Sequence, residues 1–394
     1  MNLRLLLLTL CQGMLLINNV VFIAVNGLVG LALAPTAWLA TLPITAYVAG
    51  GALATGLVAR TQRRYGRQRS FQVGLVVAMV SAAVCAWAAL NRQFWLLTAA
   101  TLVAGFYNAN GSLYRFAAVE LVKPEFKERA ISWVLAGGII GGVVGPNLAN
   151  WSRTALDVPF AGAYLALIGV AAFSLLMMSF ITFPPLPGQG STTQLGRPTA
   201  EIIRQPVFII AAAGSAISYG VMNLLMAATP IAMAQCSHPF SAAALVLEWH
   251  VLGMFLPSFF TGKLIKRFGV LPIMTTGLLL NIICVAFALT GTDVMHFLGA
   301  LLVLGVGWNF LYIGASALAT EAWRPEEKTR GQAALDFTVY STMTLTSFSS
   351  GALVTTGGWT AMNLGTLLPL LLLGAALLWL RRLRQLPVPA PAPA

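Results

Sequence analysis

Charged residues are scarce in this sequence of 394 residues, at 9% of the chain against roughly 25% in ordinary soluble domains. Acidic residues are the scarcest: 11 Asp and Glu stand against 23 Lys and Arg, a formal net charge of +12. Hydrophobic residues make up 58% of the chain. So little charge excludes an ordinary soluble domain and predicts a protein that lies mainly in lipid.

Several signatures are also missing. The sequence contains no Walker A loop, no HExxH and no GxSxG motif, which argues against an enzyme and against ATP-driven transport. The four cysteines lie apart, without CxxC spacing, so we expect neither a metal site nor a cofactor. The basic excess does not indicate nucleic-acid binding, because Lys and Arg sit in short loops between apolar runs.

What the sequence does contain is a series of long apolar runs. A run of about 20 residues is enough for a helix to cross the bilayer, and these runs, rich in Ala, Leu, Gly and Val, lack the alternation of strands. The sequence therefore predicts an all-α, polytopic membrane protein with twelve transmembrane helices in two pseudo-symmetric six-helix bundles. The expected spans are 4–28, 36–59, 70–90, 94–122, 130–152, 160–183, 205–234, 241–262, 270–291, 295–322, 332–356 and 360–381.

The domain boundaries follow from composition. We expect an N-terminal bundle over residues 1–183, a cytoplasmic linker over 184–204 that is rich in Pro, Gly, Ser and Thr, a C-terminal bundle over 205–386 and a Pro/Ala tail over 387–394. The first apolar run lacks a small-residue cleavage site, so it is interpreted as the first span and not as a signal peptide.

The basic residues predict the orientation. Of the 23 Lys and Arg, 20 fall at the ends and loops that share a side with the N-terminus, two (Arg92 and Arg153) on the opposite side, and Arg115 within a span. Positive charge collects on the cytoplasmic side, so both termini are expected in the cytoplasm. By analogy of composition we also expect a bacterial inner membrane, and we expect a monomer.

The two halves of the sequence repeat each other. A shift of 201 residues places Tyr107-Asn108 on Trp308-Asn309, Glu120 on Glu321 and Arg129 on Arg330 without a gap. Two parallel six-helix halves predict a solute path at their interface, near the middle of the bilayer.

On these residues the chain resembles the major facilitator superfamily. The two loops with Glu, Pro and Arg after spans four and ten are similar to the family's signature, and Arg64-x-Gly66-Arg67 resembles the end of its loop motif after span two. The family's acidic residue before that glycine is replaced by Arg63, and by Lys266 in the second half. The resemblance implies a gate at the cytoplasmic side, formed by Glu120, Arg129, Glu321, Arg330, Arg64, Gly66 and Arg67, with Arg129 and Arg330 as the expected partners of Glu120 and Glu321.

Span five carries a weaker resemblance. Gly137, Gly141, Gly145 and Pro146 are similar to the core of the antiporter motif in drug–proton exchangers, although the trailing Gly-Gly and the buried Arg of span four are missing. Small residues every four positions also allow another helix to approach closely, so helix packing alone can explain the ladder.

Ionisable residues inside the spans are the sharpest indication of a site, since a charge at mid-bilayer costs roughly 2.5–3.5 kcal/mol even on the lenient insertion scale. Four remain after the loops are removed: Arg115, Glu248, His250 and Asp336. Arg115 is expected to bind solute or an acid, and Glu248, His250 or Asp336 to carry a proton. Structural pairing with a polar neighbour is the alternative for each.

Polar and aromatic residues extend the candidate pathway. Asn108 and Asn309 occupy equivalent positions in the repeat, and Asn19 lies in span one. Four aromatic residues could stack on an organic solute: Trp133, Trp308, Tyr107 and Tyr340. Packing is the alternative for each of these side chains. The resemblances to the superfamily and to drug–proton exchangers imply a secondary transporter that exports a small organic solute in exchange for protons. An importer of a small metabolite, by symport or facilitated diffusion, and a membrane sensor or assembly partner that does not transport are the alternatives.

Overall fold

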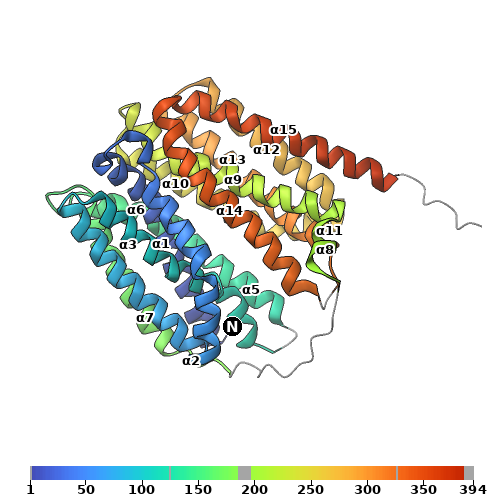
Figure 1. Ribbon diagram of the computed structural model, residues 1–394, viewed down its shortest axis with the longest axis horizontal. Helices are drawn as coiled ribbons and strands as arrows, with labels where there is room; N and C mark the ends of the chain where they lie inside the picture. Colours follow the sequence, from blue (N-terminus) through green and yellow to red (C-terminus); the bar gives the residue numbers. More distant parts are fainter. Residues whose placement is uncertain (1, 124–125, 185–196, 325–326, 386–394) are drawn as a thin grey trace, which may run out of the picture.

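The computed structural model describes residues 2–123, 126–184, 197–324 and 327–385. The helices of this part form two bundles that lie side by side, here called the N-half (residues 2–184) and the C-half (residues 197–385; Figure 1). A few side chains stand outside the description: those of Arg63, Lys127, Glu128, Arg129, Lys328 and Thr329.

The helices coincide with the expected spans, with ends that differ by a few residues. The N-half contains α1 (Leu3–Leu33), η1 (Ala37–Leu39), α2 (Leu42–Leu90), α3 (Phe94–Gly111), α4 (Tyr114–Glu120), α5 (Lys127–Ala136), α6 (Gly138–Ser152) and α7 (Ala161–Ser179). The C-half contains α8 (Thr199–Ile203), α9 (Pro206–Gln235), α10 (Phe240–Phe255), α11 (Ser258–Phe268), α12 (Val270–Thr290), α13 (Val294–Ala319), α14 (Lys328–Thr356) and α15 (Gly358–Gln385).

Two glycines turn the chain at equivalent places in the halves. Gly66 interrupts α2 with φ 81° and ψ 169°, and Gly269 separates α11 from α12 with φ 89° and ψ 163°. A positive φ of this kind is readily adopted only by glycine, because a Cβ would clash. The turn at Gly66 divides α2 into two spans, Ala37–Gln62 and Arg64–Leu90. The matching turns support the internal repeat.

Not all of the twelve expected spans are equally apolar. Within the described residues, nine helical segments are long and apolar enough to cross a bilayer, or ten if α10 and α11 form one bent span. The remaining two of the twelve are α3 with α4, and α14. These contain Asn108, Asn110, Arg115 and Asp336, and such polar residues make a span less apolar.

Span eight is bent in the structure. α10 and α11 meet at an angle of 41° beside Pro257, whose ring and missing N–H disrupt a helix. Asn309 of α13 stabilises this bend: its Nδ2 donates to the Met254 carbonyl (2.7 Å) and to Ser258 Oγ (2.6 Å), and its Oδ1 accepts from Thr261 Oγ1 (2.6 Å).

The halves pack against each other through α6 on α10, α2 on α14 and α1 on α9. Close approach requires glycine at Gly142, where a Cβ would lie 2.7 Å from Cγ1 of Val251 in the other half. A second cross-half contact joins the start of α2 to α14, where Thr41 Oγ1 donates to the Ser347 carbonyl (2.7 Å) and accepts from the Gly351 amide (2.9 Å).

Ion pairs collect at one end of the molecule, here called the basic end. In the N-half it holds Arg67 and Glu120, and α1 starts beside them, since Asn2 Nδ2 donates to the Leu121 carbonyl (2.7 Å). In the C-half it holds Arg197, Glu327, Glu321 and Arg384.

Candidate functional site between the two halves

Arg115 and Asp336 come from opposite halves and are close enough for their charges to interact, although they form no ion pair. Arg115 lies on α4 and Asp336 on α14, and the charge of Arg115 acts on the Asp336 carboxyl. Both charges also act on the hydroxyl groups of Tyr219, Tyr312 and Tyr340. The two charged groups therefore belong to one polar cluster, which we call the interface cluster: Arg115, Asp336, Tyr219, Tyr312 and Tyr340.

The interface cluster has polar neighbours on both sides. The Tyr340 hydroxyl lies near Ser112, which caps α3 in the N-half. The Tyr312 hydroxyl lies near Ser316 and Arg115. The cluster thus bridges spans four, seven, ten and eleven.

Aromatic rings pack directly against this cluster. The rings of Trp308 and Tyr312 stack with centroids 5.2 Å apart and an interplanar angle of 15°. Tyr219 stands edge-on to both, at 5.1 Å from Trp308 and 4.7 Å from Tyr312. Phe255 of α10 meets Trp308 at 6.4 Å. A flat aromatic solute can stack on such rings.

Two donors in this region are buried without a partner, Arg115 Nε and Trp308 Nε1. Buried polar groups in proteins nearly always have a hydrogen-bond partner, so each such exception needs an explanation. Both donors lie beside Tyr312: Trp308 stacks on its ring, and Arg115 lies near its hydroxyl. A solute that carries acceptor atoms on a flat ring could satisfy both.

A chain of amides leads from the N-half to the same region. Asn19 Nδ2 donates to Asn108 Oδ1 (3.2 Å), and Asn19 Oδ1 accepts from the Tyr47 hydroxyl. Asn18 Nδ2 donates to the same hydroxyl (3.0 Å). Tyr47 lies near Tyr340 of the C-half, so this chain of amides ends beside one residue of the interface cluster.

Three other predicted residues lie away from the interface cluster. Glu248 sits at the packing of α6 on α10, where it accepts a hydrogen bond from Asn147 Nδ2 (2.8 Å). His250 is fully buried between α10 and α13, and its Nδ1 donates to the Leu301 carbonyl (2.7 Å). Asn309 is fully buried as well and holds the bend of span eight. Its spacing in the repeat suggested a pathway residue, but its bonds are internal to the C-half.

The predicted gate residues are arranged differently in the two halves. Arg67 binds Glu120 through both Nε and one terminal nitrogen, at 2.6–2.9 Å, and also donates to Gln62 Oε1 (2.9 Å). Gly66 supplies the turn next to this pair, and Arg64 stacks over Tyr65 at 5.2 Å. The side chain of Arg129 lies outside the described residues, so its expected pairing with Glu120 stays a prediction.

In the C-half the expected pairing of Glu321 with Arg330 is absent. Glu321 instead accepts from Arg384 of α15 (2.6 Å), and Arg330 is exposed. The reason is positional: the last turn of α15 carries Arg384 and lies beside Glu321. Sequence spacing within one loop could not reveal a partner 63 residues away.

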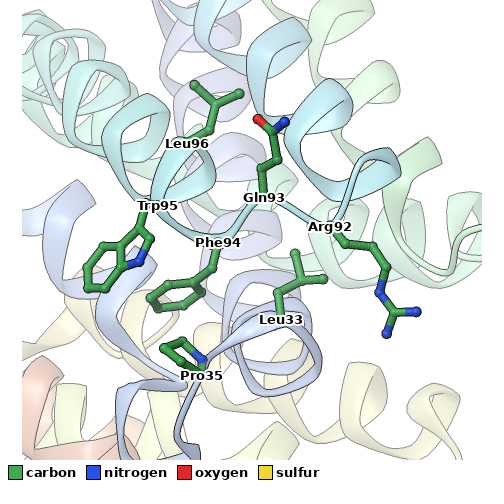
Figure 2. Close-up of a pocket in the computed structure, with 7 residues that line it drawn as sticks. All are labelled: Leu33, Pro35, Arg92, Gln93, Phe94, Trp95 and Leu96. Atoms are coloured by element: carbon green, nitrogen blue, oxygen red, sulfur yellow. The ribbon is translucent and has the colours of Figure 1, made fainter.

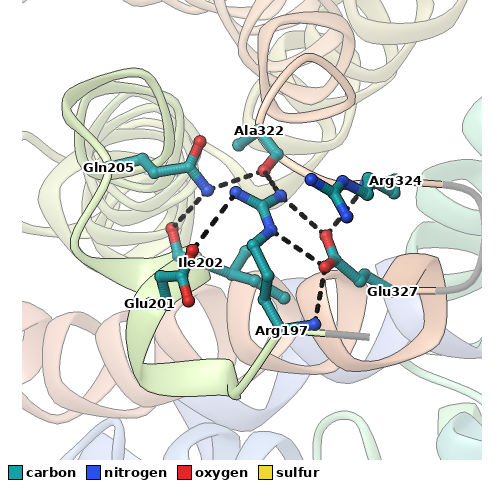
Figure 3. A network of polar contacts seen from close by, with 7 residues as sticks. All are labelled: Arg197, Glu201, Ile202, Gln205, Ala322, Arg324 and Glu327. Carbon is teal, nitrogen blue, oxygen red and sulfur yellow. Dashed lines mark hydrogen bonds and ion pairs between the residues drawn. The ribbon is translucent and has the colours of Figure 1, made fainter. Parts of the chain in front are cut away.

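The basic end holds a further ion pair that the sequence did not suggest, between Arg197 and Glu327 (Figure 3). It attaches the segment before α8 to the start of α14. The Arg197 guanidinium donates to Glu327 at 2.7 and 2.9 Å, and its backbone amide donates to the same carboxylate (2.8 Å). These bonds, with the Arg324 amide, hold the pKa of Glu327 at about 2. Arg197 and Gln205 also donate to the Ala322 carbonyl.

The glycine ladder of span five packs on α1. A Cβ at Gly137 would lie 2.2 Å from the Thr9 carbonyl oxygen, at Gly141 2.4 Å from Leu16, and at Gly145 3.0 Å from Val20. Pro146 follows inside α6. These contacts are internal to the N-half, whereas Gly142 faces the C-half, so α6 uses glycine on two sides.

A hollow of about 460 Å³ at the other end of the N-half contains none of the predicted residues (Figure 2). Phe94 and Pro35 lie next to each other in it, while the Arg92 guanidinium points away from Trp95. It belongs to the connections before α2 and α3, and the C-half contributes no lining residue among those described: Leu33, Pro35, Arg92, Gln93, Phe94, Trp95 and Leu96.

Sequence reasoning missed the tyrosines of the interface cluster other than Tyr340. A usable signal was present: Tyr312 follows Trp308 by four residues and Tyr340 follows Asp336 by four, so each pair shares one helix face. Tyr219 had no such signal, because its partners lie on another helix.

Comparison with known proteins gives a consistent picture. The family model of the Major Facilitator Superfamily matches residues 5–247 and 211–394. The "Riboflavin transporter RfnT" of Brucella anthropi is 39% identical over 361 residues, which are 91% of this chain and 90% of the relative. The "Uncharacterized MFS-type transporter YddS" of Bacillus subtilis is 26% identical over 366 residues, 88% of this chain and 84% of that protein.

Solved structures agree on the fold. The crystal structure of the nucleoside transporter NupG superposes with a TM-score of 0.72 at 13% identity, over 95% of this chain and 99% of that one. A bacterial homolog to the human lysosomal transporter Spinster, in an inward-facing and occupied conformation, gives 0.71 at 16% identity over 98% of both chains.

Proposed function

Because the chain belongs to the major facilitator superfamily, we propose that it is a secondary transporter of an uncharged flavin, with riboflavin as its solute. The observation that carries this proposal is the pair of unpartnered buried donors, Arg115 Nε and Trp308 Nε1, beside the stacked rings of Trp308 and Tyr312. The similarity to the riboflavin transporter of Brucella anthropi supports it independently.

The chemistry of the interface cluster suits this solute. The isoalloxazine ring of a flavin is flat and aromatic, so it can stack on Trp308 and Tyr312. The ring carries two carbonyl oxygens, which can accept hydrogen bonds from the two unpartnered donors, Arg115 Nε and Trp308 Nε1. The hydroxyl-rich side chain of riboflavin needs partners such as Ser112, Tyr340 and the amides of Asn19 and Asn108, which lie on the N-half side.

We further propose that the direction is uptake across a bacterial inner membrane, with the basic end and both termini in the cytoplasm. Export by proton exchange was favoured by the glycine ladder of span five. In the structure those glycines pack on α1, so packing accounts for them without an exchange role. Asp336, whose carboxyl lies within the electrostatic reach of Arg115, is the proposed proton carrier.

The test is direct binding and uptake. Riboflavin added to the purified protein is expected to lose fluorescence as its ring stacks on Trp308, and cells unable to synthesise riboflavin are expected to grow on low external riboflavin when they express the chain. Trp308→Leu should abolish both effects. Trp151→Leu, which removes a tryptophan that is 71% exposed, is the matched control and should abolish neither.

Two outcomes would overturn the proposal. One is an unchanged riboflavin signal and no growth with a folded wild-type protein. The other is riboflavin accumulation in inverted membrane vesicles under a proton gradient but not in right-side-out vesicles, which would restore export as the direction.

A further inference from the structure

The start of α2 is anchored in the N-half at the end of the molecule opposite the basic end, here called the far end. Thr41 stands immediately before α2, which then runs for about 36 Å, at 1.5 Å per residue, to the turn at Gly66 in the basic end. The preceding residue packs closely on α1, because a Cβ at Gly30 would lie 2.0 Å from the Ala40 carbonyl oxygen. Thr41 itself is fully buried, and its hydroxyl reaches α14 of the C-half.

This one hydroxyl serves both backbone groups of a single helical turn. Thr41 Oγ1 donates to the Ser347 carbonyl (2.7 Å) and accepts from the Gly351 amide (2.9 Å). The two groups are four residues apart, so they are the acceptor and donor that an α-helix joins to each other. Glycine at 351 admits the hydroxyl, since a Cβ there would lie 2.5 Å from Thr41 Oγ1. When Thr41 withdraws, the two backbone groups can bond to each other, and neither is left without a partner.

The same face of α14 carries two hydroxyls that are buried without a partner, Ser347 Oγ and Ser350 Oγ. Residues 347, 350 and 351 are spaced i, i+3 and i+4, so they lie together on the face that meets Thr41. Buried polar groups nearly always have a partner, and each exception needs an explanation. Water would bind both hydroxyls in a conformation in which α14 and Thr41 are parted. Such a conformation accounts for two serines that the present packing leaves unsatisfied.

Contacts between the halves differ at the two ends of the molecule. At the far end, Trp38 meets Phe348 edge-on at 5.9 Å, and Phe160 before α7 meets Phe240 of α10 at 4.8 Å. At the basic end, the ion pairs between described side chains each stay within one half: Arg67 with Glu120, Arg197 with Glu327, and Arg384 with Glu321. The described conformation therefore joins the halves at the far end through both aromatic and hydrogen-bonded contacts.

We propose that Thr41 and the turn of α14 over residues 347–351 form a latch that holds the halves together at the far end, and that solute passes this end only when the Thr41 hydroxyl has left α14. The latch holds through two hydrogen bonds. It can be released without stranding a backbone group, because α14 can close its own turn. It acts on the rocking of the halves, whichever solute is carried.

The latch can be tested by the reactivity of a thiol at residue 347 in the purified full chain. Ser347→Cys places this thiol on the face of α14 that meets Thr41, and Cys236→Ser removes the native cysteine that is not fully buried. The rate of reaction with a water-soluble maleimide then reports how often this face meets water. The same protein without Ser347→Cys gives the background rate of the three buried native cysteines: Cys11, Cys85 and Cys284.

Removal of the hydroxyl should expose this face more often. Thr41→Val keeps the shape of the side chain, and labelling of Ser347→Cys should become about three- to tenfold faster, the effect of losing a hydrogen bond between membrane helices. Thr41→Ser keeps the hydroxyl and should leave the rate unchanged. Thr101→Val is the matched control, because Thr101 is fully buried and donates within α3, to the Thr98 carbonyl (2.9 Å). It should leave the rate unchanged as well.

A second reporter separates release of the latch from general loosening of the protein. Ser81→Cys, introduced in place of Ser347→Cys, lies in the part of α2 after Gly66, and Ser81 is likewise buried without a partner. Thr41→Val should leave the labelling rate of Ser81→Cys unchanged. Equal acceleration at both reporters, or an unchanged rate at Ser347→Cys, would overturn the latch.

Should Thr41→Val not fold, Gly351→Ala decides with the same two reporters. Its methyl group would lie 2.5 Å from Thr41 Oγ1, so it should displace the hydroxyl and accelerate labelling at Ser347→Cys alone. An unchanged rate there would overturn the latch. Riboflavin binding is measured on the same samples. If none binds while the labelling rates change as expected, the proposed function fails and the latch stands.

Discussion

Asn147 of α6 donates a hydrogen bond of 2.8 Å from its side-chain amide to the carboxylate of Glu248 on α10, and this bond joins the two halves. The same amide donates to the Val143 carbonyl, which fixes its direction. Glu248 had been expected to carry a proton because it is an acid within a span. Its bond to Asn147 gives it a structural partner, so its neutralisation and its removal should have different effects.

We expect Glu248→Gln to transport nearly as well as the wild type, because the glutamine oxygen still accepts from Asn147. Glu248→Leu removes the acceptor and should lower the stability of the protein by about 0.5–2 kcal/mol, in the range of hydrogen bonds between membrane helices and to charged groups. Thermal unfolding in detergent and proton-driven flux in vesicles are the measurements. Loss of gradient-driven flux in Glu248→Gln, with exchange retained, would instead identify Glu248 as the proton carrier.

The close packing of α6 on α10 can be tested at one glycine. Gly142→Ala places a Cβ 2.7 Å from Val251 Cγ1, and overpacking of this kind typically costs about 1–3 kcal/mol. We expect slower transport and a lower unfolding temperature. Val251→Ala should restore both in the double variant, since it removes the clashing methyl groups.

Gly169→Ala is the matched control for that series. A Cβ at Gly169, within α7, would have no atom within 4 Å, so the change should be neutral or slightly stabilising. Equal effects of the two glycine substitutions would show that helix propensity, and not contact between the halves, is being measured.

The Arg197–Glu327 pair predicts a pH dependence. The pKa of Glu327 is about 2 in the folded protein, below its usual value of 4.5, because Arg197 and the Arg324 amide bind the ionised form. Because folding lowers the pKa of Glu327, its ionised carboxylate stabilises the fold at any pH above about 4.5. This stabilisation is lost as the pH falls from about 4.5 towards 2. Glu327→Gln should therefore lower the unfolding temperature at about pH 7 and make a much smaller difference at about pH 3.

Glu201→Gln provides the comparison for the pH series. Glu201 also approaches Arg197, at 3.8 Å, but its side chain is 57% exposed, and exposed ion pairs contribute little. Its substitution should change the unfolding temperature little at either pH. A pH-independent effect of Glu327→Gln would contradict the role assigned to the ionised carboxylate.

Asn309 offers a test of the bend in span eight. Asn309→Leu removes all three side-chain bonds to α10 and α11 and leaves Thr261 Oγ1 without its acceptor on α13, so we expect a loss of about 1–3 kcal/mol. Riboflavin affinity per folded molecule should change less than in Trp308→Leu. An affinity loss as large as that of Trp308→Leu at unchanged stability would place Asn309 in the solute pathway, as its position in the repeat had suggested.

The sequence predicts much of this fold for one physical reason: a membrane span must be a long apolar helix, and its ends carry basic residues. The repeat added the equivalence of Gly66 and Gly269, and the structure gives both glycines the same backbone conformation. Arg115 and Asp336 could also be singled out, because so few charges lie within the apolar runs.

The partners of these residues could not be predicted. Glu120 and Arg67 are 53 residues apart, and Glu321 and Arg384 are 63 apart, so their pairing depends on how whole helices are placed. Aromatic residues such as Tyr219 are common in spans, so the sequence does not single Tyr219 out. Its place in the site follows only from its ring contacts with Trp308 and Tyr312 in the structure. Asn309 of α13 differs from Asn108 because it forms hydrogen bonds with α10 and α11 at the bend beside Pro257.

The attachment of Arg197 to Glu327 and Ala322 has a practical consequence for measurements of motion. Helix α8 follows Arg197 directly and packs on α14, so it should travel with the C-half as one rigid body when the halves rock. A spectroscopic label on Thr199 would then report the position of the C-half, and a second label on Gln68, which donates to the Ser179 carbonyl, that of the N-half. The distance between the two labels would measure how far the halves move apart during transport, without a substitution in the interface cluster.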